Sequence, residues 1–301
     1  MRRALCAGLL GLAVATAGLS AHAQSRCADY IPQPKPQNTG RDIVGADLDT
    51  IVERGWIDIV LYEDFPPWSY EKAGKPAGVD VDIGALVAEA LGVKPRFRLV
   101  AAGENLQADL RNWVWKGPVV GGRVGNLMMH VPYDSDFACR VEQVVFTGQY
   151  ATERVAIAYS KAAYPDEKPV PAYFRYDTVG VENDSIADFY LTAFPGGQLN
   201  KNMRRYPSTA AAMEGLAKGE VMAVMAPRAQ LEAGLNDGLA VHEPPLPGFA
   251  VGSWVVGVAT HFSYRGLSYA VDDAIAAALT DGRIPEIFAA HGLTFEPAPY
   301  R

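Results

Sequence analysis

The stretch from Asp47 to Gly92 decides the fold and reads DLDTIVERGWIDIVLYEDFPPWSYEKAGKPAGVDVDIGALVAEALG. Asp47 is expected to N-cap a short helix that ends at Gly55, since aspartate accepts from free helical N–H groups and glycine adopts the left-handed turn. The apolar run at residues 56–62 predicts a first sheet strand. Pro66-Pro67 ends that strand and predicts an exposed loop that carries aromatic residues.

A second helix is expected after this loop. Asp82 is predicted to be its N-cap, and apolar residues recur behind it at three- and four-residue spacing, as on the buried face of a helix. They are Ile83, Leu86, Val87, Ala90 and Leu91. Strand, aromatic loop and helix then form one βα unit. Open α/β sheets bind ligands at the carboxyl ends of their strands, which is where this loop is expected.

Three blocks of this stretch resemble the start of the amino-acid-binding type II periplasmic solute-binding proteins. That family has a helix reading LDxIxxRG, a loop reading YPPFxY and a helix opening with GFDVDL. The chain carries all three in order, with Phe65, Trp68 and Val79 as substitutions. The resemblance covers roughly residues 47–295. It implies an α/β class and a two-lobed periplasmic binding protein type II fold with two hinge crossings.

Domain boundaries follow from the N-terminus and from this resemblance. Arg2, Arg3, an apolar run and Ala21-His22-Ala23 indicate a cleaved secretory signal peptide, and hence a periplasmic protein. The alternative is an N-terminal membrane anchor, for which the run is too short and too rich in alanine and glycine. The predicted segments are 1–23 (signal peptide), 24–46 (a proline-containing arm), 47–152 with 254–301 (lobe one) and 153–253 (lobe two), with crossings near 151–155 and 250–256.

Composition indicates a globular protein, with 49% apolar and 20% charged residues among 301. Without the signal peptide, 25 basic and 34 acidic residues remain, a formal charge of −9. Such a chain is a poor candidate for binding nucleic acid or an anionic membrane. No later segment reaches transmembrane length, and a monomer is expected.

Cys27 and Cys139 remain after signal cleavage in an oxidising compartment, which favours a disulfide over two separate buried thiols. The chain has no Cys-x-x-Cys pair. The histidines of the mature chain are scattered without metal-ligand spacing and are interpreted as structural. They are His130, His242, His261 and His291. Neither a metal nor a cofactor is therefore expected.

The resemblance also implies where an amino-acid ligand would be held. In the family an arginine grips the ligand carboxylate seven residues before the serine of a VxFS block. Arg140 has that place before Thr147, with a surface salt bridge as the alternative. The acid that binds the ligand ammonium is replaced by Pro227, and the family's GTT helix start reads Asp184-Ser185-Ile186. An α-amino acid is therefore not the expected ligand.

Aromatic side chains are predicted to line the cleft in place of the charged groups of an amino-acid site. Trp68, Tyr133 and Phe137 follow loop residues and are expected to be exposed there, whereas the methionines are expected in the core. The predicted ligand or partner site comprises Phe65, Trp68, Tyr70, Trp113, Trp115, Tyr133, Phe137, Arg140 and Ser185. Such a surface suits an apolar ligand or the side chains of another protein.

A subgroup resemblance gives the leading function. Residues 126–133 (NLMMHVPY) look like the DVVMGVP block of proteins encoded beside pyrroloquinoline-quinone (PQQ)-dependent alcohol dehydrogenases. With residues 113–118 they are most similar to the MxaJ/XoxJ-type proteins of methanol oxidation, especially the XoxJ type that goes with lanthanide enzymes. This implies a periplasmic accessory factor that binds or helps activate a quinoprotein methanol dehydrogenase, with its cytochrome as a further candidate partner.

Two alternatives stay open. The first is an importer component that binds a small molecule other than an amino acid. The second is a cleft dehydratase of the cyclohexadienyl dehydratase type, for which Glu182 or Asp184 is the candidate acid. The chain has no motif for a nucleophilic serine, a zinc protease, a phosphate loop or a dinucleotide, so no enzyme is expected. The ligand and the partner's stoichiometry stay open.

Overall fold

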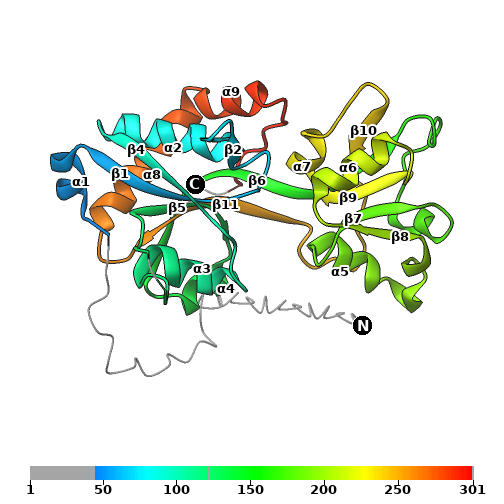
Figure 1. Cartoon of the computed structure of the whole chain (residues 1–301), viewed down its shortest axis with the longest axis horizontal. Helices are drawn as coiled ribbons and strands as arrows, with labels where there is room; N and C mark the ends of the chain where they lie inside the picture. Colours follow the sequence, from blue (N-terminus) through cyan, green and yellow to red (C-terminus); the bar gives the residue numbers. More distant parts are fainter. Residues whose placement is uncertain (1–44, 121, 300–301) are drawn as a thin grey trace, which may run out of the picture.

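The computed structural model describes residues 45–120 and 122–299 and confirms the predicted α/β class (Figure 1). Two lobes are joined by the long strands β6 (Val144–Ser160) and β11 (Ser253–His261). The signal peptide, nearly all of the predicted arm and Cys27 lie outside the described residues. None of the described helices is long and apolar enough to cross a bilayer.

The first elements form as the sequence predicts. Helix α1 (Leu48–Arg54) begins where Asp47 accepts a 2.9 Å hydrogen bond from the Thr50 N–H, and it ends at Gly55 with φ 75°. Strand β1 (Trp56–Tyr62) follows at once. Local capping and an apolar run therefore suffice to fix this part of the fold.

Helix α2 (Val79–Ala90) begins earlier than predicted, and Asp82 is not its N-cap. The cap is Gly78, which has no side chain to offer. The aromatic loop supplies the acceptors instead, because the backbone N–H groups of Val79 and Asp80 donate to the carbonyls of Pro67 and Trp68. Asp82 lies in the first turn, 2.7 Å from His291.

The sheet of lobe one runs β4-β1-β5-β11-β6, with β4 (Lys94–Val100) and β5 (Leu127–Tyr133) parallel to β1. One face packs against α2, α8 (Arg265–Thr280) and α9 (Arg283–Ala290). On the other face lie α4 (Ser135–Arg140) and α3 (Leu106–Leu110), which is followed by the π-helical turn η1 (Arg111–Trp115). Figure 1 shows α2 and α9 above this sheet and α3 and α4 below it.

The sheet of lobe two repeats this order as β8-β7-β9-β6-β10. β8, β7 and β9 are parallel, and the strand that comes first in the chain, β7, lies between the second and the third, as β1 does in lobe one. The described strands and helices of this lobe are β7 (Val179–Glu182), α5 (Ile186–Thr192), β8 (Met203–Tyr206), α6 (Thr209–Ala217), β9 (Ala223–Pro227), α7 (Arg228–Glu232) and β10 (Leu239–His242), with short helical turns at Pro171–Arg175, Pro195–Gly197 and Asn200–Asn202.

β6 and β11 pair from Arg154 with Ser253 to Val144 with His261. Both crossings are therefore strands, while the predicted lobe boundaries at 152/153 and 253/254 stay a prediction. A small hairpin of β2 (Tyr70–Lys72) and β3 (Lys75–Ala77) completes the aromatic loop.

Replacing Gly78 by alanine is expected to destabilise the protein by about 3 kcal/mol or more, since its φ of 124° and ψ of 173° lie where other residues are strained. A Cβ there would also lie 2.3 Å from the Trp68 carbonyl oxygen. Gly92→Ala is the matched control: φ is 67° and a Cβ meets nothing within 4 Å, so about 1 kcal/mol is expected. Urea unfolding of both variants measures the difference, and equal costs would contradict this account of α2.

Candidate functional site: a cleft between the lobes

A cleft of about 680 Å³ lies at the carboxyl ends of β1 and β7. Lobe one contributes the aromatic loop and the start of β2. Lobe two contributes the end of β7 and parts of α6 and α7. The lining residues are Asp64, Phe65, Pro66, Tyr70, Glu71, Glu182, Ser208, Thr209, Ala210, Met213, Glu214, Ala217, Gln230, Ala233 and Gly234. This is the position in which open α/β sheets bind ligands.

The charged side chains that line the described part of the cleft are all acidic. Asp64, Glu71, Glu182 and Glu214 line it, and the described lining residues include neither lysine nor arginine. Carboxylates gathered in a concave surface raise the local concentration of cations and repel anions. The cleft therefore suits a cationic group and disfavours a ligand carboxylate.

The helix N-terminus in the cleft is already occupied by a carboxylate of the protein. Glu182 Oε2 accepts from the Thr209 N–H at 2.9 Å and from the Thr209 hydroxyl at 2.8 Å. Ser208 caps the same helix, α6, by accepting from the Ala211 N–H at 3.1 Å. Two of the first-turn N–H groups that would attract an anion, those of Thr209 and Ala211, are thus satisfied from within.

Of the predicted aromatic residues, only Phe65 and Tyr70 line this cleft. The expectation that Trp68 is exposed is wrong: it is 1% exposed and packs against His130 and Phe288, with ring centroids 4.4 and 5.7 Å away. The loop turns back on itself, because the Trp68 and Ser69 N–H groups both donate to the Phe65 carbonyl. This turn directs the indole into the core of lobe one.

The other aromatic side chains lie elsewhere on lobe one. Trp113, Trp115 and Phe137 are half-buried against the core under α3 and η1. Tyr133 borders a separate hollow of about 790 Å³ beside the first half of β6 and α8. The structure therefore does not bring the predicted aromatic set together.

The predicted polar residues are also dispersed. Arg140 is exposed at the end of α4, with its guanidinium 6.0 Å from the Phe137 ring centroid, and it does not line the cleft. Ser185 caps α5 by accepting from the Asp188 N–H, and it too lies outside the cleft lining. Pro227 ends β9 beside the crossing strand β6. The disulfide stays a prediction, because Cys27, the predicted partner of Cys139, lies outside the described residues.

Sequence analysis missed Glu153, which lies on β6 where the chain passes between the lobes. Its side chain is 3% exposed and accepts from the Arg154 N–H at 2.9 Å and from the Ala229 N–H of lobe two at 3.5 Å. Oε2 is buried without a hydrogen-bond partner. Burial raises the pKa of Glu153 to about 7. A signal existed, since Glu153 and Arg154 are the only charged residues of a seventeen-residue strand.

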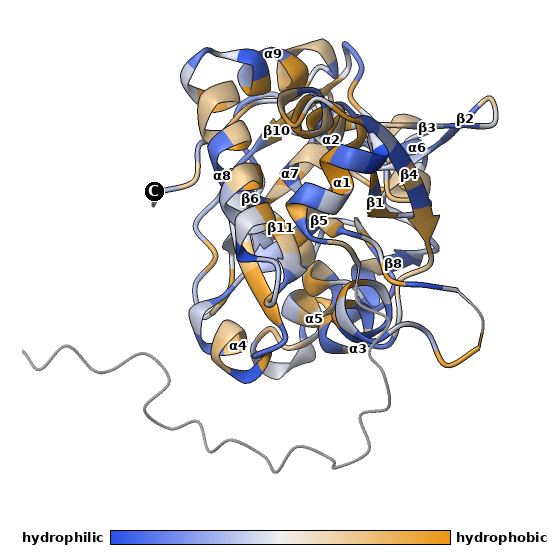
Figure 2. Ribbon diagram, turned by 90° about the vertical axis from the view of Figure 1, so that its left-hand side faces the viewer, coloured by the Kyte–Doolittle hydropathy of each residue, from blue (hydrophilic) through white to orange (hydrophobic). Residues whose placement is uncertain are grey.

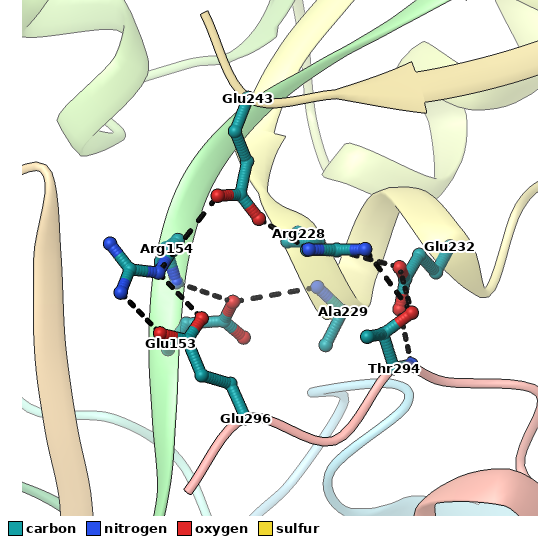
Figure 3. A network of polar contacts seen from close by, with 8 residues as sticks. All are labelled: Glu153, Arg154, Arg228, Ala229, Glu232, Glu243, Thr294 and Glu296. Atoms are coloured by element: carbon teal, nitrogen blue, oxygen red, sulfur yellow. Dashed lines mark hydrogen bonds and ion pairs between the residues drawn. The ribbon is translucent and has the colours of Figure 1, made fainter. Parts of the chain in front are cut away.

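Ion pairs around Glu153 link the two lobes (Figure 3). Arg154 pairs with Glu296 of the segment after α9 and lies 3.9 Å from Glu243, which follows β10. Arg228 of α7 pairs with the same Glu243 and, at 2.7 Å, with Glu232. One chain of alternating charges thus runs from the C-terminal segment across the crossing strand into lobe two.

Thr294 extends this link. Its N–H and its hydroxyl donate to the two carboxylate oxygens of Glu232 at 2.7 and 2.8 Å. On the same segment the Glu296 carbonyl accepts from the Thr152 N–H at 2.8 Å. The segment therefore contacts both the crossing strand and α7, which fixes the relative orientation of the lobes. Within the described residues, no group of three His, Cys, Asp or Glu side chains could hold a metal ion.

Comparison with known proteins supports this fold. Residues 57–112 match the model of bacterial extracellular solute-binding proteins, family 3. No curated protein matches the chain closely enough to count as a relative. The family match thus covers the first βα unit of lobe one, β4 and the start of η1.

Three solved structures share the architecture. An ancestral cationic amino acid solute-binding protein has a TM-score of 0.66 at 19% identity, with 81% of this chain and 99% of that chain covered. An ancestral amino-acid-binding protein, a precursor of cyclohexadienyl dehydratase, has a TM-score of 0.58 at 19% identity, with 81% of this chain and 98% of that chain covered. The solute receptor for L-cysteine of Neisseria gonorrhoeae has a TM-score of 0.56 at 21% identity, with 82% of this chain and 93% of that chain covered. At these identities the similarity shows the fold.

The buried carboxyl of Glu153 is expected to make stability depend on pH. Its folded pKa of about 7 exceeds the ordinary value of 4.5, so the folded state binds the proton more tightly than the unfolded state. The contribution of this group to the free energy of unfolding is present in full below pH 4.5. It is lost as the pH rises to about 7, and the loss is at most about 3 kcal/mol. Glu153→Gln, which resembles the protonated acid, is expected to unfold at higher urea than the native protein at pH 8 but not at pH 4.5. The same difference at both pH values would contradict this assignment.

Proposed function

We propose that this chain is a periplasmic protein of the solute-binding family that serves as a non-catalytic accessory factor of a PQQ-dependent methanol dehydrogenase, of the lanthanide type. The partner is proposed from the sequence resemblance at residues 113–118 and 126–133. The structural observation that carries the proposal is a binding-protein cleft whose described lining has four carboxylates and no cationic side chain to hold an amino-acid carboxylate. The protein has the fold of a binding protein, but carboxylates line its cleft where a charged pair for an amino acid is expected.

An α-amino acid needs a cation for its carboxylate and an anion for its ammonium, both in water-poor surroundings. Arg140 lies outside the cleft lining, and Glu182 occupies the start of α6. Pro227 stands at the end of β9, where the family's acid would be. The carboxylate of the ligand would therefore meet four carboxylates of the protein and no compensating base in the described lining.

Protein side chains suit the same cleft. Phe65, Tyr70 and Met213 offer apolar area, and a lysine or arginine inserted by the partner would meet the surrounding carboxylates. Aromatic residues in a partly closed pocket commonly carry the largest share of a protein–protein binding energy. Neither Glu182, held by Thr209, nor Asp184, exposed outside the cleft lining, has the setting of a catalytic acid, which supports a non-catalytic role.

Tyr70→Ala is expected to weaken binding to purified quinoprotein methanol dehydrogenase by about 2 kcal/mol, roughly thirtyfold. Tyr176→Ala removes the same side chain from an exposed surface position of lobe two and is the matched control. Surface plasmon resonance at low salt measures both affinities. Trp68→Ala is unsuitable, because it would open a core cavity. Absence of binding by the unaltered protein would refute the accessory role.

The second candidate is an importer component for a small cation. The four carboxylates of the cleft favour it specifically, since they suit an amine or guanidine that carries no carboxylate. Its volume of about 680 Å³ is within the usual range of small-molecule sites.

Arginine and agmatine separate these possibilities, because they share the guanidinium group and differ in the α-carboxylate. Calorimetry is expected to show no tight binding of arginine or other standard amino acids to the purified protein. If agmatine binds at least about tenfold more tightly than arginine, the importer candidate gains support. Sub-micromolar binding of any standard amino acid would overturn the account of the cleft given above.

A further inference from the structure

Four arginines gather on lobe one, away from the cleft. On β1 the residues Val60, Asp58 and Trp56 point to one face of the sheet, since side chains alternate along a strand. Val60 packs against Leu110 and Val114 under α3 and η1. Trp56 and Asp58, nearer the start of the strand, have arginine side chains around them instead.

Trp56 is the centre of this group. The guanidinium carbons of Arg54 and Arg96 lie 3.5 and 3.8 Å from its ring centroid, and that of Arg123 lies 6.0 Å away. Arginine stacks favourably on an indole face, which fixes the plane of the guanidinium and the direction of its N–H donors. These side chains are therefore ordered before any partner arrives.

Asp58 is the one carboxylate that forms ion pairs with these arginines among the described residues. Arg98 and Arg123 both lie 3.2 Å from Asp58 Oδ2. Arg54 donates to the Trp56 carbonyl and to the Asn126 side chain, both neutral. Among the described residues no other carboxylate forms an ion pair with these arginines, so four positive charges meet one negative charge on a chain whose formal charge is −7.

The excess charge is reflected in the arginines themselves. Burial lowers the pKa of Arg54, Asp58 raises it, and the neighbouring charges of Arg123 and Arg96 lower it again. Like charges held together at partial burial are unfavourable unless an anion approaches. Arg96 is exposed, and the Arg123 side chain keeps 60% of its accessible surface, so both can be reached.

Apolar residues line a hollow beside Arg98 and Arg123 and precede Arg123 in the chain. Gly122 and Arg123 line a hollow with Arg98, Trp113 and the chain from Leu99 to Ala101, and Glu63 borders it. A few residues before Arg123 in the chain, Val119 and Val120 are 83% and 90% exposed. Figure 2 shows the hydrophilic first residues of β4, from which Arg96 and Arg98 come. Arginine and tryptophan beside exposed aliphatic side chains are the composition of protein interfaces, whereas a lone anion would use only the charges.

We propose that the cluster of Arg54, Trp56, Arg96, Arg98 and Arg123 is a docking surface for the acidic surface of another protein, separate from the cleft. Carboxylates of the partner would accept paired hydrogen bonds from the planar guanidinium groups. The neighbouring valines would cover apolar surface of the same partner. A purely protective role is the competing explanation, because charged residues on an edge strand such as β4 also prevent sheets from pairing edge to edge.

A fluorescein-labelled ten-residue peptide of alternating glutamate and leucine tests the proposal by fluorescence anisotropy at low salt. Arg96→Ala with Arg123→Ala is expected to weaken its binding about tenfold, since each exposed charge contact contributes modestly. Both side chains are exposed, so the fold is expected to persist, and circular dichroism with urea unfolding verifies this. Arg175→Ala with Arg265→Ala removes the same charge from exposed positions elsewhere and is expected to change binding less than twofold.

Three results would overturn the proposal. They are equal weakening by both double variants, no binding of the peptide by the unaltered protein, and stronger binding to phosphatidylglycerol vesicles than to the peptide. The last result would indicate a membrane surface as the occupant. The experiment contains no dehydrogenase, so its failure is distinguishable from failure of the accessory role.

Discussion

The buried carboxylate of Asp80 joins the segments that build the lobe-one side of the cleft. Its Oδ1 accepts a 2.6 Å hydrogen bond from the Tyr150 hydroxyl, which itself accepts from the His130 N–H. The Asp80 N–H donates to the Trp68 carbonyl, so one residue contacts the aromatic loop, β5 and β6. Asp80 is fully buried, and losing a partner there would leave a charge or a hydroxyl unpaired in the core. The position of Phe65 and Tyr70 in the cleft depends on this node.

Charge is distributed unevenly over lobe one. The loop after β1 presents acidic residues to the cleft, while the start of the same strand is surrounded by arginines. The two ends of β1 therefore present opposite potentials to anything that approaches. A protein with a basic protrusion and an acidic surface would find a complementary site at each end, and complementary charges chiefly raise association rates and select partners.

Sequence reasoning succeeded where the determinants are local. Asp47 and Gly55 bound a helix by their own chemistry, and the apolar run at residues 56–62 located β1. It failed at Asp82 and Trp68, because the acceptors for α2 are backbone carbonyls of the preceding aromatic loop, and no residue type reveals that the loop folds back onto the start of the helix. The cleft's position was predicted from strand ends, but its acidic lining was not, since Glu182 and Glu214 reach it only through the packing of lobe two.

β6 and β11 have a thermodynamic consequence for the whole molecule. β6 pairs with β9 and β10 in one lobe and with β11 in the other, so each sheet contains part of the same strand. Unfolding either lobe alone would strip hydrogen bonds and core contacts from the crossing strand that the other lobe needs. The ion pairs of Arg154 and Arg228 add to this dependence. The two lobes are therefore parts of one cooperative unit, in which destabilisation of one lowers the melting temperature of both.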